Sequence, residues 1–414
     1  MMTCLLLYAY GVGVFSSRKI ARACERNLAF LAIVGEERPD FRTISLFRKT
    51  HLEAFAGVFV QVLLLAKAAG LVRLGTIAID GTKVQGNASR HRAMSYGYMT
   101  QEVARLRAEI DQLLQQAQAV DAQDDAALGC RRGDELPEEL RRREDRLAVI
   151  EAAMKRLEAE ARAAAAAERQ RREEAEAERQ RTGTKRRGRA PGPIVETPAA
   201  KAQVNFTEPE LSIMKTANKG WDCCGNAQAS VDDGCQIIMA CEVTAECNDK
   251  RQAEPMAQAT RSQLDQAGIA QAAGPTGARP PIPAALDTGY FSAEAVAALR
   301  REGFDPHIAT ERQRHHNATG TATSEPGPEP ATAKEKMQAK LKAPAGRAIY
   351  ARRKVIVEPV FGQIKEARGF RRFLLRGLEQ IRGEWRLVCL THNLLKIWRY
   401  GNGFLRGSGC ALIK

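Results

Sequence analysis

The stretch IAIDGTKV at residues 77–84 decides the fold class of this 414-residue chain. A short apolar run ends at Asp80, and the turn residues Gly81 and Thr82 follow it. This pattern is typical of a buried strand whose last side chain emerges at the edge of a sheet. It therefore predicts a sheet-based domain with a carboxylate at its edge.

Two further acidic segments lie far away in the chain. ALDTGYFS, at residues 285–292, repeats the strand-then-acid pattern with Asp287, and VEPVFGQIK, at residues 357–365, places Glu358 at a helix start before Pro359. Carboxylate oxygens are the ligands that Mg²⁺ prefers, so the three acids together would suit a site that cuts or joins phosphodiester bonds. Each acid alone is more simply a turn or surface residue.

The segments between these acids predict alternating strands and helices. A hairpin is expected over residues 226–244 around Asp232-Asp233-Gly234, followed by a helix at 254–267, a strand at 283–287, a helix at 293–303 and a strand at 307–310. Residues 311–346 read as loose, and helices dominate from 346 to 400. The order favours an α/β domain, a mixed sheet with helices on its faces.

A long charged insertion interrupts this domain. Heptad-spaced apolar residues mark two helical arms, one near Leu106 and Ile110 and one from Leu140 to Leu157. Gly129 to Gly133 offers a reversal, so the insertion reads as a helical hairpin. Residues 161–182 read as an exposed helix, and 181–193 as a basic linker.

The first 73 residues read as helical. Short helices near Ile20 and Ile44, joined by a Gly/Pro turn and dotted with Arg42, Arg48 and Lys49, suggest a helix-turn-helix that contacts DNA. The alternative is a helical subdomain that only packs on the rest.

The net charge of +14 favours a polyanionic partner, most commonly nucleic acid. Ten Cys show no zinc or disulfide spacing, and the apolar stretches are too short or too polar to span a membrane, so we expect a soluble, intracellular protein without membrane contact.

The basic charge concentrates around Glu358. Arg352, Arg353 and Lys354 precede it, and Lys365 follows two helical turns later on the same face of an ideal helix. A lysine that grips phosphate beside a metal-binding acid suits a nucleic-acid substrate. The basic face continues with Arg368, Arg371, Arg372, Arg376 and Arg382, for which a solvated helix face is the alternative.

The three acidic segments resemble those of the DDE transposases of bacterial insertion sequences. The resemblance extends through EWRLVCLTHNLLKI, through Asn205 to Lys215, through NAQASVDDGCQII with Val243-Thr244 and Asn248-Asp249, and through the helical start from Tyr8 to Phe59. It implies an RNase H-like mixed sheet with flanking helices, a helical N-terminal domain and a helical-hairpin insertion. The expected boundaries are a helical N-terminal domain at 1–73, the first catalytic strand at 74–98, the insertion and basic linker at 99–200, the rest of the catalytic domain at 201–400, and a tail at 401–414.

Carried over residue by residue, the resemblance implies Asp80, Asp287 and Glu358 as catalytic ligands of Mg²⁺, with Mn²⁺ able to substitute. Tyr350, Arg353 and Lys365 match the tyrosine, arginine and lysine of the family signature around the last acid. The basic residue four positions before the glutamate is Lys354, so either Lys354 or Arg353 contacts DNA. Arg368 completes the predicted DNA-binding set.

The implied activity is cleavage at transposon ends and transfer of the freed 3′-hydroxyl into target DNA. The implied partners are double-stranded DNA and a second copy of the chain, in the bacterial cytoplasm at the nucleoid. The segment Gly220-Trp221-Asp222-Cys223-Cys224-Gly225-Asn226 departs from the family's Gly-Tyr-Asn run, and the N-terminus reads as shortened. The alternatives are a metal-dependent nuclease without strand transfer and an inactive, truncated transposase that only binds DNA.

Overall fold

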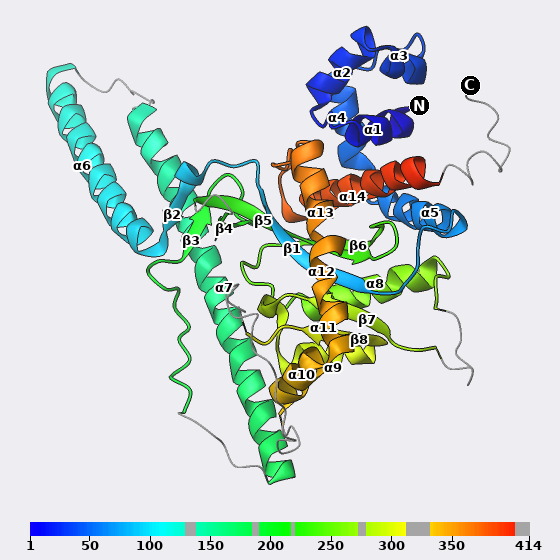
Figure 1. Ribbon diagram of the computed structural model, residues 1–414. Coiled ribbons are helices and arrows are strands. Elements are labelled where there is room, and N and C mark those ends of the chain that lie inside the picture. Colours follow the sequence, from blue (N-terminus) through cyan, green and yellow to red (C-terminus); the bar gives the residue numbers. More distant parts are fainter. Residues whose placement is uncertain (129–137, 184–189, 217–219, 272–278, 312–331, 402–414) are drawn as a thin grey trace. The chain divides into compact units, whose positions relative to one another are not determined.

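The computed structural model describes residues 1–414 except 129–137, 184–189, 217–219, 272–278, 312–331 and 402–414 (Figure 1). The chain forms two compact units, one from residues 1–87 and 214–414 and the other from residues 88–213. The first unit contains the sheet and the three predicted acids, and the second is the insertion.

A mixed sheet forms the centre of the first unit, and six strands of it lie in the described residues. They are β1 (Ile77–Gln85), β4 (Ser212–Lys215), β5 (Trp221–Asp232), β6 (Ile238–Thr244), β7 (Ile282–Leu286) and β8 (Phe304–Ile308). β1 pairs antiparallel with β5, and β5 pairs antiparallel with β6. On its other side β1 pairs parallel with β7, and β7 with β8. The predicted α/β class and the hairpin around Asp232-Asp233-Gly234 are confirmed.

Helices cover the sheet. α8 (Ala253–Gln266) packs on β6 and α9 (Ala293–Arg301) on β8. α11 (Pro344–Ala351) packs on β7 and β8, and α12 (Arg353–Ile356) on β1. In Figure 1 α10 (Ala333–Lys342) to α13 (Glu358–Gly362) form a column across the sheet. After a π-helical turn at Gln363–Ala367, α14 (Leu378–Tyr400) packs on β6 and places Trp385 in the core, fully buried.

α10 corrects the prediction that residues 311–346 are loose. Thr332 accepts a hydrogen bond from the Glu335 backbone, and the Glu335 side chain accepts one from the Thr332 backbone. This capping box satisfies two backbone donors at the helix start, and buried Met337 anchors the helix. The remainder of the predicted loose segment, residues 312–331, lies outside the described residues.

The N-terminal part is helical, as predicted. It contains α1 (Met2–Gly11), α2 (Ser17–Arg26), α3 (Leu28–Val34), α4 (Phe41–Thr50) and α5 (Ala54–Ala68). α1 and α5 pack on α14, which joins these helices to the first unit. No single described helix is long and apolar enough to cross a membrane; the bent pair α4 and α5, which meet at 79°, reaches that length and composition only together.

The second unit is built on the long helices α6 (Tyr96–Leu128) and α7 (Glu138–Thr182) and the short paired strands β2 (Ala93–Ser95) and β3 (Gln203–Asn205). Leu106 from α6 packs with Ile150 and Leu157 from α7, which confirms the apolar contacts of the two arms. The predicted reversal at Gly129 to Gly133 lies outside the described residues.

Candidate active site

The sheet register brings the two aspartates together. In the parallel pair of β1 and β7, Ile79 lies opposite Leu286, and the next residues in the two strands are Asp80 and Asp287. The predicted strand end at Asp80 is wrong, because β1 continues through Gly81 and Thr82 to Gln85, where these residues pair with β5. Asp80 therefore lies within β1, beside Asp287, which directly follows the last residue of β7. Glu358 is the first residue of α13, as its position before Pro359 predicts.

One guanidinium joins the three acids. Arg353 Nη1 donates a hydrogen bond of 2.9 Å to Asp80 Oδ2, while Arg353 Nη2 lies 3.7 Å from Asp287 Oδ1 and 3.5 Å from Glu358 Oε1. The Arg353 side chain is 10% exposed, whereas Asp287 and Glu358 are each 50% exposed. Three acids from separate segments of the chain thus share one counter-charge.

The electrostatics of this group follow from burial. Desolvation raises the pKa of Asp80 to about 6, although Arg353 and the Gly81 amide favour the ionised form. Asp287 and Asp249 add like charge and push the same pKa upward. Burial works to lower the pKa of Arg353, but Asp80, Asp287 and Glu358 outweigh it and the net shift is upward. The site therefore carries excess negative charge that a cation relieves.

The donor chemistry fits a hard divalent cation, because Mg²⁺ prefers carboxylate oxygens and these three converge on one positive group. Among the residues that the structure describes, no group of three or more His, Cys, Asp or Glu side chains is close enough to hold a metal ion. The cation that the three acids share here is the guanidinium of Arg353.

The predicted DNA-binding residues occupy different environments. Lys354 is exposed and Tyr350 is half-buried, and the Tyr350 hydroxyl is hydrogen-bonded to Arg353. Lys365 Nζ donates to Thr82 Oγ1 and, at 2.8 Å, to the Lys83 carbonyl. Desolvation is the main cause that lowers the pKa of Lys365. Lys365 therefore lies against β1, a few residues beyond Asp80.

Arg368 does not fit its predicted role. It is 9% exposed, and its guanidinium donates to the Val388 and Tyr10 carbonyls, both at 2.9 Å, and to Thr391 Oγ1. The π-helical turn at Gln363–Ala367 adds one residue to the helical repeat. A prediction based on α-helical spacing therefore assigns Arg368, which follows this turn, to the wrong face. We correct Arg368 to a structural residue that fastens α1 to α14.

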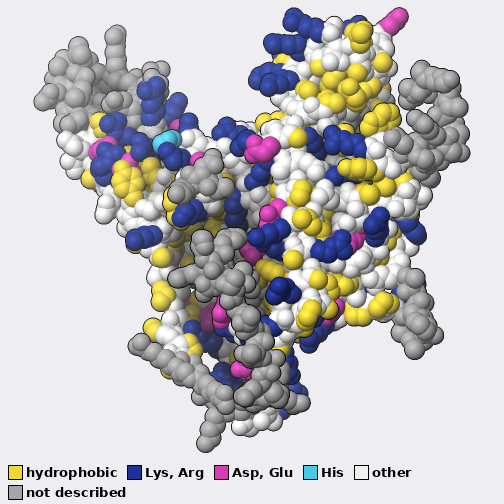
Figure 2. All heavy atoms as spheres, in the orientation of Figure 1, with side chains coloured by type: hydrophobic (Ala, Val, Ile, Leu, Met, Phe, Trp, Pro, Cys, Tyr) yellow, Lys and Arg dark blue, Asp and Glu magenta, His cyan; other side chains and the backbone are white. Residues whose placement is uncertain are grey.

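Arg48 needs the same correction. It was expected on a DNA-facing helix, but it is 4% exposed and donates to the Tyr10 hydroxyl and the Phe15 carbonyl. The exposed basic side chains of this part lie in α2, in the segment that follows α3, and in α4. They are Arg18, Lys19, Arg22, Arg26, Arg38, Arg42 and Lys49. Figure 2 shows basic side chains gathered over the N-terminal helices.

Sequence reasoning misses a polar network on β5, the strand that pairs with β1. Asn226 and Gln228 on β5 are fully buried and both donate to Asp249, which precedes α8. The sequence NAQAS at residues 226–230 does carry a signal for this network. Its alternation puts the amides of Asn226 and Gln228 on one face of a strand whose other residues are typical of a core.

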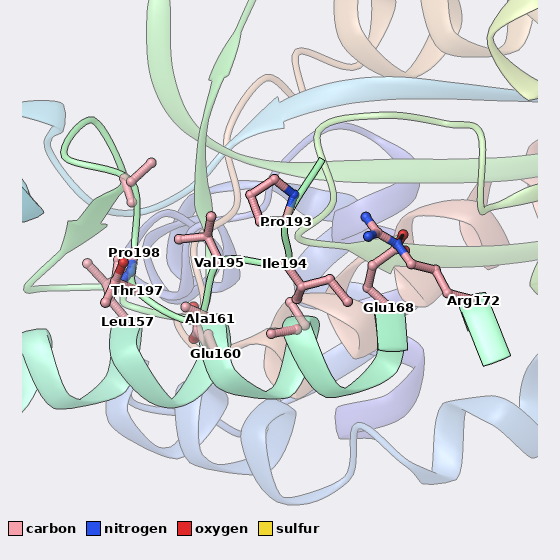
Figure 3. Close-up of a pocket in the computed structure, with 14 residues that line it drawn as sticks. Leu157, Glu160, Ala161, Glu168, Arg172, Pro193, Ile194, Val195, Thr197 and Pro198 are labelled. Carbon is pink, nitrogen blue, oxygen red and sulfur yellow. Dashed lines mark hydrogen bonds and ion pairs between the residues drawn. The ribbon is translucent and has the colours of Figure 1, made fainter. Parts of the chain in front are cut away.

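A separate cavity of about 470 Å³ lies in the second unit, between α7 and the extended segment from Pro193 to Ala202 (Figure 3). Its floor is the alanine-rich face of α7, and Arg172 closes one side by donating to Glu168 and to the Gly192 carbonyl. None of the three predicted acids lines this cavity.

Fold and site together define an α/β protein with a carboxylate centre at its sheet edge. The family model described as Transposase DDE domain matches residues 312–398, and the one described as Transposase domain (DUF772) matches residues 1–50. No curated protein and no solved structure matches the chain significantly.

Both matched segments are transposase domains, and the first is a DDE transposase domain, the domain of a polynucleotidyl transferase. This confirms the resemblance read from the sequence. The first matched segment includes Glu358 and Arg353, whereas Asp80 and Asp287 lie outside both matches, so their grouping with Glu358 rests on the fold.

Proposed function

We propose that this transposase cuts the phosphodiester bond at transposon ends and transfers the freed 3′-hydroxyl into target DNA, with Asp80, Asp287 and Glu358 as its catalytic residues. The observation that carries the proposal is the convergence of these three carboxylates on Arg353. An acid cluster of that kind at a sheet edge, in a protein of this family, supports phosphodiester chemistry.

The three carboxylates would hold Mg²⁺, or Mn²⁺ in its place. Bound there, a divalent ion activates the attacking hydroxyl and neutralises charge on the scissile phosphate. The protein's own part is to fix the carboxylates on rigid elements, with Asp80 within β1, Asp287 directly after β7 and Glu358 at the start of α13. The surplus negative charge around Asp80 favours cation binding over an empty site.

Basic residues around Glu358 would bind the DNA backbone. Arg353 is engaged with the three acids, which favours exposed Lys354 as the phosphate contact, together with Tyr350 and Lys365. Lys365 stands against β1, where its charge would act on a phosphate near Asp80. The exposed arginines and lysines of α2 and α4 would hold further duplex DNA, and two copies of the chain would act together on two ends.

We also propose that the sheet is RNase H-like. The support is its strand order, in which the antiparallel strands β6, β5 and β1 are followed by the parallel strands β7 and β8.

The test uses the full chain, Mg²⁺, a labelled duplex that ends in the terminal repeat flanking the gene, and supercoiled target DNA. We expect end cleavage and a labelled joint product, both lost in Asp80→Asn and kept in Asp265→Asn, a matched change at an exposed acid on α8. Cleavage without joint product would indicate a nuclease, and binding without cleavage would indicate an inactive DNA-binding protein.

A further inference from the structure

A fourth carboxylate lies beside the catalytic aspartates. Asp249 Oδ1 accepts a hydrogen bond of 2.7 Å from Asn226 Nδ2 and one of 2.9 Å from Gln228 Nε2. Lys83 Nζ lies 3.8 Å from the same oxygen. Two buried amides and one lysine on β1 thus converge on Asp249, which fixes its side chain from two neighbouring strands.

This network lies next to Asp80 along the sheet. In the sheet register Gln228 lies opposite Gly81 and Asn226 opposite Lys83. A Cβ at Gly81 would stand 2.2 Å from Gln228 Nε2 and 2.9 Å from Asp249 Oδ1, so only glycine leaves room for the network. Gly81 lies within β1 and not in a turn, so the space that Asp249 and its amide partners occupy is what requires a glycine there.

The same network reaches Asp287. The Tyr290 hydroxyl, three residues after Asp287, donates to Gln228 Oε1, and Tyr290 is fully buried. A Cβ at Gly289, in the same turn, would lie 3.8 Å from both Cβ and Oδ2 of Asp249. The turn that carries Asp287 is thus tied through Gln228 to the strand that carries Asp80.

We propose that Asp249 is a positioning residue of the catalytic centre. Its carboxylate orients Gln228 and Asn226, and Gln228 in turn holds the Tyr290 turn against β1, which sets the spacing between Asp80 and Asp287. The inference rests on the proposed function, because it assumes that these two aspartates hold the metal. Asp249 acts through its hydrogen bonds and does not touch the metal or the DNA.

The chemistry of the contacts separates this role from that of a metal ligand. Asp249 uses one oxygen to accept both amide hydrogens, and the carbonyl oxygen of an asparagine accepts two as well. Asp249→Asn therefore preserves the hydrogen bonds and removes only the charge, while Asp249→Ala removes both.

The experiment measures Mn²⁺ binding to the full chain without DNA, by the electron paramagnetic resonance signal of free Mn²⁺. We expect Asp249→Ala to weaken binding by about 10-fold or more, the usual effect of losing a residue that orients metal ligands. Asp249→Asn should bind close to wild type, and so should Asp265→Ala, an exposed acid on α8. Tyr290→Phe, which removes only the hydroxyl bonded to Gln228, should weaken binding and tests the same network if the alanine variant does not fold.

Wild-type binding in both Asp249→Ala and Tyr290→Phe would overturn the positioning role. Equal weakening in Asp249→Asn and Asp249→Ala would overturn it too, because the charge and not the hydrogen bonds would then matter. Asp80→Asn separates the failure of the positioning role from the failure of the proposed metal centre. If Asp80→Asn loses Mn²⁺ binding while Asp249→Ala retains it, only the positioning role fails. If Asp80→Asn binds as wild type, the proposed metal centre fails, and the positioning role with it.

Discussion

Replacing Asp80 with Asn should stabilise the fold while it removes activity. Burial raises the pKa of Asp80 to about 6 from the ordinary 3.8, so the folded protein resists ionising this group. The folded state is favoured in full below about pH 3.8, and this advantage is lost as the pH rises toward 6, because the unfolded chain releases the proton first. The difference between these two pKa values corresponds to about 3 kcal/mol of lost folding stability above pH 6. Asparagine carries no charge and can still accept the Arg353 hydrogen bond.

We therefore expect Asp80→Asn to raise the free energy of unfolding by about 1–3 kcal/mol at pH 8 and by about 1 kcal/mol or less at pH 4.5. The assay is urea unfolding in EDTA, followed by tryptophan fluorescence. Trp385 reports on the sheet directly, because it is fully buried and its Nε1 donates a hydrogen bond of 3.0 Å to the Gln228 carbonyl on β5. Asp265→Asn controls for the change of chemistry at an exposed position. A variant less stable than wild type at pH 8, or equally shifted at both pH values, would refute the reasoning.

Three further predictions concern the residues around the acids. Arg353→Gln removes the counter-charge shared by three carboxylates, so Mn²⁺ should bind about 3- to 10-fold more tightly in a direct titration. Arg347→Gln, at an exposed site on α11, should leave the Mn²⁺ affinity unchanged. Weaker Mn²⁺ binding by Arg353→Gln would contradict the shared counter-charge. Arg368→Met removes three buried hydrogen bonds, those to the Tyr10 and Val388 carbonyls and to Thr391 Oγ1, and should cost about 2–4 kcal/mol in urea unfolding. The salt dependence of DNA binding by the folded variant should stay unchanged, and a shallower salt slope would restore its DNA role. Gly81→Ala drives a Cβ into Gln228 and should destabilise the sheet by about 1–3 kcal/mol, and an unchanged unfolding midpoint would argue against the packing described.

Much of the fold could be predicted from local patterns. Short apolar runs predict β6 and β7 and part of β1, β5 and β8. The structure extends β1 beyond Asp80 to Gln85, begins β5 at Trp221, and places β8 at Phe304–Ile308, where the sequence predicts a strand at 307–310. α10 escaped prediction because its surroundings are rich in Gly, Pro and Ala, and only the Thr332–Glu335 pair signals a helix. The pairing of β1 with β7 could not be read from either strand, since about 200 residues separate them and hydrophobic burial gives no register.

The site could be predicted in part, for a different reason. The residue types at Asp80, Asp287 and Glu358 carry the chemistry, and the sequence correctly places Asp287 after a strand and Glu358 at a helix start. It wrongly ends the first strand at Asp80, because the backbone pairing that carries β1 on to Gln85 comes from β5, which is distant in the chain. Which basic residues face inward depends on helix phase, and the π-helical turn after α13 changes that phase. Arg368 was misassigned for this reason, and the central position of Arg353 depends on the short helix α12 packing on β1.

The central claim is that three carboxylates from separate elements form one catalytic metal centre. Single-turnover cleavage of transposon-end DNA in Mg²⁺ tests it most directly, with Asp80→Asn, Asp287→Asn, Glu358→Gln and the control Asp265→Asn measured side by side. We predict that each of the first three lowers the cleavage rate by about 10²-fold or more, while the control cleaves as wild type. Wild-type rates in the three carboxylate variants would contradict the account.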